Sequence, residues 1–88
     1  MSNTIKGTIK EIGEEVRFES GFYKRTVLVD TGGEWPQVLP VDFVKENTKK
    51  VEGLQPGTAV TVSIDIRSHK TDRGRYFVDL VGWKVEEL

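Results

Sequence analysis

The 88-residue sequence contains no cysteine, one histidine, one methionine and three prolines. Without cysteine there can be no disulfide, no thiolate zinc site and no thiol nucleophile. A metal site would need His69 together with scattered carboxylates, and no neighbouring residue supplies the partner that orients a catalytic histidine. We therefore expect no metal, no cofactor and no enzymatic activity.

Long apolar runs are also absent. No stretch approaches the roughly 20 residues that span a bilayer, and the N-terminal residues MSNTIKGTIK lack the apolar region of a secretory signal. These features predict a cytoplasmic protein that has no membrane partner. The length predicts one small domain over residues 1–88, and 36% hydrophobic with 31% charged residues is typical of a folded, globular chain.

Net charge is low, with 13 Lys and Arg against 14 Asp and Glu. This balance disfavours a strong, unselective binder of polyanions. The basic residues are nevertheless concentrated in one stretch, RSHKTDRGR, from Arg67 to Arg75. It holds four basic residues and one histidine against a single acid, so positive charge is segregated along the chain.

Alternating apolar and polar residues predict five strands. They are expected at residues 4–16, 22–30, 35–43, 59–67 and 75–85. A bulge is plausible at Ile12–Gly13, where the alternation slips. The residues TGG, Thr31–Gly33, predict a tight hairpin. Pro36 and Pro40 cannot donate to a ladder, so the third strand is expected to be irregular or at an edge.

Residues Val44 to Leu54 form the one helical candidate, with its helical part at about Val44–Val51. Asp42 could cap this helix and Gly53 could end it. Three strands, one short helix and two further strands are the layout of an OB-fold, a mainly β, five-stranded Greek-key barrel. An SH3-like barrel is the alternative, but it usually lacks a helix at this position.

Four segments of the sequence carry a family resemblance: IKGTIKEI, VDTGGEWPQ, PGTAVTVSIDI and RYFVDLVGWKVE. They resemble a small, largely uncharacterised family of bacterial and phage OB-fold proteins that is grouped with single-stranded DNA-binding proteins. Gln37 and Val38 replace a basic pair of that family, and Val44 replaces an aromatic residue. The resemblance implies the OB-fold and nucleic-acid binding.

In an OB-fold, the loop between the fourth and fifth strands flanks the ligand groove over strands two and three. The basic stretch, predicted to be a mobile loop, falls at that position. Cations there would neutralise phosphates, and nearby aromatic rings would stack on bases. The candidate nucleic-acid-binding residues are Phe22, Tyr23, Lys24, Arg25, Trp35, Arg67, Lys70, Arg73, Arg75 and Tyr76. Phe43 is assigned to the core, Trp83 to the core or to packing at an end of the barrel, and Phe77 remains ambiguous.

The leading hypothesis is a single-stranded DNA-binding protein of replication, recombination or repair, bacterial or phage-encoded, which acts largely without sequence readout. RNA is a further possible ligand, and a homo-oligomer or a replication or recombination protein is a possible partner. The alternative is an OB-type module that binds a protein and no nucleic acid. Near-neutral charge and the outward apolar residues Val38 and Pro40 favour that alternative.

Overall fold

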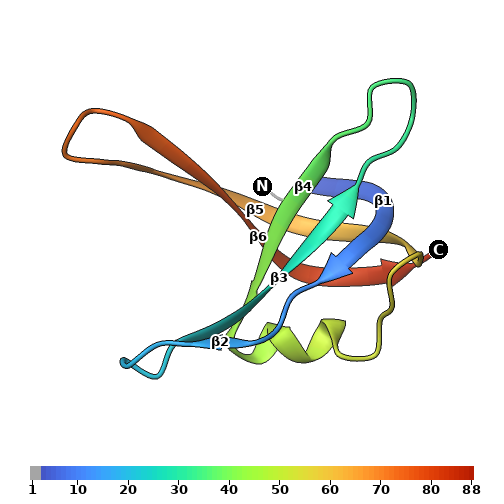
Figure 1. The fold of residues 1–88 in the computed structure, drawn as a ribbon, viewed down its shortest axis with the longest axis horizontal. Helices are drawn as coiled ribbons and strands as arrows, with labels where there is room; N and C mark the ends of the chain where they lie inside the picture. The colour runs from blue at the N-terminus through green and yellow to red at the C-terminus, as the bar shows by residue number, and fades with distance from the viewer. Residues whose placement is uncertain (1–2) are drawn as a thin grey trace.

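The structure, a computed structural model, describes residues 3–88, which form six strands and one short helix (Figure 1). In chain order these are β1 (Asn3–Ile12), β2 (Val16–Arg17), β3 (Tyr23–Asp30), β4 (Val38–Val44), the 3₁₀ helix η1 (Lys45–Val51), β5 (Ala59–Lys70) and β6 (Tyr76–Glu87). The five long strands lie close to the predicted positions.

The sheet closes into a barrel. Its strand order is β1-β5-β6-β4-β3-β2, and a further pairing of β1 with β3 joins the two sides. The pairing of β4 with β6 is parallel, whereas the other pairings are antiparallel. With η1 between the third and fourth long strands, this is the predicted Greek-key layout, and the fold class is confirmed.

Strand alternation builds the core, because every second side chain of each strand points into the barrel. The buried apolar residues are Ile9, Val27, Val29, Val41, Phe43, Val51, Val60, Val62 and Ile64. Phe43 is fully buried, as predicted. Its ring lies against Gly82, where a Cβ atom would come within 2.4 Å of the ring. Trp83 is 37% exposed, so it is not a core residue; packing at the barrel end, the other position expected for it, stays a prediction.

Two expectations about strand irregularity need correction. The bulge in β1 lies between Ile9 and Glu11, not at Ile12–Gly13, and β1 ends at Ile12. The third long strand, β4, is not an edge strand, because it pairs with β3 along its length and with β6 at Val41 and Asp42. Pro40 lies just outside the short ladder with β6. The ladder therefore requires no hydrogen bond from the N–H that proline lacks.

The connection between β3 and β4 is longer than the predicted tight hairpin and spans residues 31–37. Gly32 and Gly33 have φ values of 66° and 81°, which glycine adopts at little steric cost. The helical segment is also present, but as a 3₁₀ helix whose N-cap is Val44 without a side-chain bond. Asp42 is therefore not a cap; it lies within β4.

The main departure from expectation is the basic stretch, which is mostly strand rather than loop. Within residues 3–88, β1 pairs with β5 as far as Ile64, and β4 pairs with β6 at Leu80 and Val81. Among these described residues, β5 and β6 then pair with each other alone and form an arm, residues 66–79, that projects from the barrel (Figure 1).

A short turn closes the arm. The N–H of Thr71 donates to the carbonyl of Arg75 at 2.7 Å, and the N–H of Gly74 donates to the carbonyl of Thr71 at 2.9 Å. Gly74 has a φ of 80°, which suits glycine in such a turn. The irregular part of the basic stretch is thus limited to the tip. In residues 3–88, no helix is long and apolar enough to cross a membrane.

Candidate nucleic-acid interface

A groove lies over the outer face of β3 and β4, next to the base of the arm. Its volume is about 270 Å³. Phe22, just before β3, and Lys24 come from one side, since they alternate with the residues that point into the barrel. Arg67 comes from the arm on the other side. The complete lining is Phe22, Lys24, Asp42, Val44, Arg67, Asp79 and Val81.

Acidic residues lie beside the cations of this groove. The Nζ atom of Lys24 lies 3.4 Å from the Oδ2 atom of Asp42, and both side chains are largely buried, with 33% and 19% exposed. The hydroxyl of Thr26 donates to the other oxygen of Asp42. On the arm, Arg67 pairs across the ladder with Asp79. The groove therefore carries positive charge that nearby carboxylates partly compensate.

The face of the arm that carries Arg67 continues the groove outward. His69 lies two residues further along β5, on the same face, and pairs with Phe77 of β6. The two rings have centroids 5.8 Å apart and an interplanar angle of 36°. The Nδ1 atom of His69 lies 3.7 Å from the Oδ2 atom of Asp79. Aromatic and charged groups thus alternate along this face.

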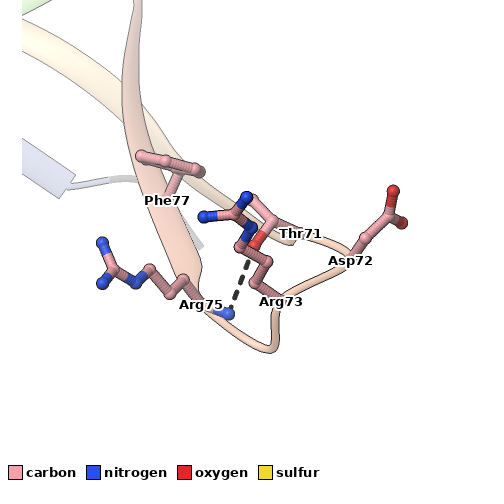
Figure 2. Close-up of a pocket in the computed structure, with 5 residues that line it drawn as sticks. All are labelled: Thr71, Asp72, Arg73, Arg75 and Phe77. Atoms are coloured by element: carbon pink, nitrogen blue, oxygen red, sulfur yellow. Dashed lines mark hydrogen bonds between the residues drawn. The ribbon is translucent and has the colours of Figure 1, made fainter.

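A second cavity, of about 350 Å³, lies at the tip of the arm. Figure 2 shows its lining: the guanidinium of Arg73 lies between Phe77 and Thr71, whereas the carboxylate of Asp72 points away and Arg75 extends to the other side. The hydroxyl of Thr71 accepts a bond from the N–H of Arg75 at 3.3 Å. Phe77 is 54% exposed. The tip therefore places a solvent-accessible ring and two arginine side chains around one cavity.

Five of the predicted site residues lie on this continuous surface, which we call the binding face. They are Phe22, Lys24, Arg67, Arg73 and Arg75. Lys70 and Tyr76 form a cross-strand pair on the opposite face of the arm. There the Nζ atom of Lys70 lies 6.0 Å from the centroid of the Tyr76 ring.

The remaining three predicted residues lie elsewhere. Tyr23 and Arg25 have the same strand parity as buried Val27, so they point to the barrel side of β3 rather than to the groove. The guanidinium of Arg17 covers the Tyr23 ring at 4.7 Å, and the Nε atom of Arg25 is buried. Trp35 lies on the β3–β4 loop, which extends in a different direction from the arm (Figure 1).

Two aromatic residues on or beside the binding face were not among the predicted site residues. Phe77 was ambiguous because its exposure depends on how far the arm projects. Phe18, in the turn after β2, is 47% exposed, and its ring centroid lies 5.7 Å from that of Phe22. The sequence signal for Phe77 is its parity, since it falls two residues from Arg75 and two from Asp79 on the same strand.

Two further features of the described residues concern metal ligands and titratable groups. Residues 3–88 contain no group of three or more His, Asp and Glu side chains that could hold a metal ion. The pKa of Glu86 is lowered, because Lys84 donates a hydrogen bond to its carboxylate and adds an opposite charge. Glu86 lies opposite Thr61, at the end of β6 away from the arm, so this shift has no part in the binding face.

Comparison of the sequence with protein families gives a match to DUF3127, a domain of unknown function. The sequence model of this family matches residues 4–86, nearly the whole chain. The chain belongs to the DUF3127 family. A comparison with curated proteins gave no significant match.

Solved structures show which fold this DUF3127 domain shares. Rim1, a mitochondrial single-stranded DNA-binding protein from S. cerevisiae, superposes with a TM-score of 0.83 and 14% sequence identity, over 100% of this chain and 95% of Rim1. The SSB domain of a Synechococcus sp. protein superposes with a TM-score of 0.74 and 14% identity, over 96% of this chain and 91% of that domain. At this identity the likeness shows the OB-fold, as predicted, and the fold alone.

Proposed function

We propose that this DUF3127 protein binds single-stranded DNA along the binding face. The observation that carries the proposal is continuity: cations and exposed rings follow one side of the molecule from the groove over β3 and β4 to the tip of the arm. This is the position at which OB-folds bind oligonucleotides. The fold shared with Rim1 and the Synechococcus SSB domain supports the proposal.

The two kinds of side chain have separate tasks. Lys24, Arg67 and the tip arginines attract the phosphate backbone and release counterions from it. Phe22 and Phe77 offer flat rings on which bases of any identity can stack. Such contacts read phosphates and base faces rather than base edges, so we expect little sequence preference. A role in replication, recombination or repair follows as part of the proposal.

Asp42 and Asp79 moderate the affinity. Each lies beside a cation of the binding face, and a carboxylate repels a phosphate that approaches the same cation. We therefore expect moderate binding that weakens steeply with salt, in keeping with a chain whose net charge is −1.

Fluorescence anisotropy of labelled oligonucleotides tests the proposal. Oligo-dT, a mixed-sequence strand, the same strand as RNA and its DNA duplex are titrated with protein at two or more salt concentrations. We expect both DNA single strands to bind with similar affinity and the duplex to bind more weakly. Absence of binding to single strands at low salt would contradict the proposal. The titration with RNA shows whether the protein also binds RNA single strands.

A second candidate function rests on the opposite face of the arm. Ile66, Tyr76 and Val78 share that face and are 55%, 67% and 62% exposed. An apolar face of this kind is typical of protein-binding surfaces, and it favours an OB-type interaction module. If single strands do not bind at low salt, this module becomes the better-supported function.

A further inference from the structure

Trp35 is the most exposed large apolar residue of the described chain, with 83% of its surface accessible. It belongs to the loop of residues 31–37, which we call the Trp35 loop. Tryptophan has a large apolar surface, and it is enriched among the residues that dominate protein interfaces. Because so little of its ring contacts its own chain, Trp35 contributes little to the fold. Its ring is therefore available for contact with another molecule.

The Trp35 loop is held in one conformation at its base. The N–H of Thr31 donates to the carbonyl of Gln37 at 2.9 Å, and the N–H of Gln37 donates to the hydroxyl of Thr31 at 3.0 Å. The N–H of Gly32 donates to the carboxylate of Asp30 at 2.8 Å. A loop that is ordered before binding loses less conformational entropy on docking. The loop is therefore suited to insert Trp35 into a cavity.

The tip of the arm provides a complementary cavity. It is a depression of about 350 Å³, largely open to solvent, and it is lined by Thr71, Asp72, Arg73, Arg75 and Phe77. An indole could stack on Phe77, and guanidinium groups bind tryptophan more strongly than other rings. Glu34, beside Trp35, would pair with an arginine of the tip.

Charge makes the two surfaces complementary. Residues 31–37 contain one acid, Glu34, and no base, whereas residues 70–75 contain Lys70, Arg73 and Arg75 against Asp72. The two surfaces cannot meet within one chain as folded, because Trp35 is almost fully exposed and the loop and the arm project from the barrel in different directions (Figure 1).

We propose that the protein associates head to tail with further copies of itself, the Trp35 loop of one protomer docking into the arm-tip cavity of the next. Such an interface joins two different surfaces, so every open assembly keeps one free Trp35 loop at one end and one free arm tip at the other, and it grows into chains or closes into a ring. The contact is small, and association is weak and salt-sensitive. The self-association does not depend on the proposed function, because it requires no nucleic acid.

Sedimentation velocity on nuclease-treated protein tests this proposal, at concentrations up to about 1 mM, where interfaces of this size associate. Two variants divide the interface: Trp35→Ala removes the docking residue, and the double variant Arg73→Glu with Arg75→Glu reverses the charge of the cavity. Phe18→Ala, which removes an exposed aromatic from a different turn, is the matched control. Circular dichroism melts verify that all variants are folded.

We expect the wild type and Phe18→Ala to form oligomers that grow with concentration, and each interface variant alone to be monomeric. The mixture of the two interface variants is decisive. The intact arm of Trp35→Ala can accept the intact loop of the arginine variant, so the mixture forms a dimer and no larger species. A wild type that is monomeric at every concentration overturns the proposal, as do variants that still self-associate or a mixture that stays monomeric.

Discussion

Phe77 is the residue that distinguishes the arm from a merely basic hairpin. Its ring is 54% exposed, pairs with His69 and borders the tip cavity between two arginines. Proteins that bind single-stranded nucleic acid stack the bases on exposed aromatic rings that lie among cationic side chains. The surroundings of Phe77 match this arrangement. In the proposed function, binding of single-stranded DNA by the arm therefore depends on this side chain as much as on the charges.

Phe77→Ala should weaken binding to oligo-dT about 5- to 150-fold, which corresponds to the roughly 1–3 kcal/mol of one stacked base. The melting temperature should stay close to that of the wild type, because the ring is largely outside the core. Fluorescence anisotropy and a thermal melt measure the two quantities. Tyr76→Ala, on the opposite face of the arm, is the control, and an equal loss of affinity in that variant would show that the two faces are not distinct.

Gly82 has a purely structural role. A Cβ atom at this position would lie within 2.5 Å of two atoms of the buried Phe43 ring. Gly82→Ala should therefore destabilise the fold by about 1–3 kcal/mol through overpacking, with a loss of about 4–8 °C in Tm per kcal/mol. In the control, Gly53→Ala, the added methyl group meets no atom within 4 Å. A thermal melt in which both variants match the wild type would disprove the packing at Gly82.

Sequence alone assigned some of these residues correctly and others not, for physical reasons. The core positions Val27, Val29, Val41 and Phe43 follow from strict alternation, which fixes the face of each side chain. Trp83 has the parity of Val85, which packs against the core, but it is 37% exposed because the ladder shifts register there. Ser63 pairs with Lys84 and Ile64 with Gly82, so Trp83 has no partner on β5 and Gly82 instead faces the ring of Phe43. The barrel-side positions of Tyr23 and Arg25 also follow from parity, since both alternate in phase with buried Val27. Their prediction as site residues rests instead on the neighbouring basic and aromatic residues.

Among the elements, the arm is notable because its two faces differ in chemistry. It continues β5 and β6 without interruption beyond the last contacts with β1 and β4. A two-stranded ribbon is marginally stable by itself, so its order depends on the barrel strands from which it grows. Its alternation then gives it two faces, one with Arg67, His69, Phe77 and Asp79, the other largely apolar.

The arginines of the binding face should set the salt dependence of nucleic-acid binding. In the triple variant in which Arg67, Arg73 and Arg75 become Ala, we expect the slope of log affinity against log salt to flatten by about 2 units, at roughly 0.7 per phosphate contact. Titrations at three or more salt concentrations give the slope. Lys70→Ala, which removes a cation from the opposite face, should leave it unchanged; an unchanged slope in the triple variant would mean that the arginines touch no phosphate.

Removal of the distal arm should separate binding from folding. Replacement of residues 69–77 by Asn-Gly keeps the Ser68–Val78 pair and closes it with a two-residue hairpin. We expect the barrel to melt cooperatively near the wild-type temperature, since the core residues all lie outside the arm, and single-stranded DNA affinity to fall sharply. Loss of the folded barrel would show that the arm has a structural role.

The arm also shows where sequence-based prediction of an element reaches its limit. Polar residues with turn-forming Gly74 resemble an exposed loop, and the hydrophobic alternation of β5 ends at Ile66. The pairing from Arg67 to Lys70 is visible only when β6 supplies the opposite strand, because backbone hydrogen bonds rather than side-chain burial hold this part of the ladder. The length of the β3–β4 loop is likewise not predictable from the sequence, because the TGG residues indicate a turn but do not determine how many residues it contains.

For the molecule as a whole, closure of the barrel is what brings the binding face together. Phe22 and Lys24 come from one third of the chain and the arm from another, and the parallel pairing of β4 with β6 places them on either side of one groove. The order of strands and helix was sufficient to predict this architecture, because few topologies close a barrel from five strands. The precise set of residues on the face depends on the length of the arm.

The most direct test of the central proposal is an anisotropy titration of the unmodified protein with labelled single-stranded and duplex DNA of the same sequence at two salt concentrations. We predict tighter binding of the single strand than of the duplex and weaker binding of both at the higher salt. Equal affinity for the two forms, or no binding of the single strand at low salt, would contradict the assignment of this surface to single-stranded DNA.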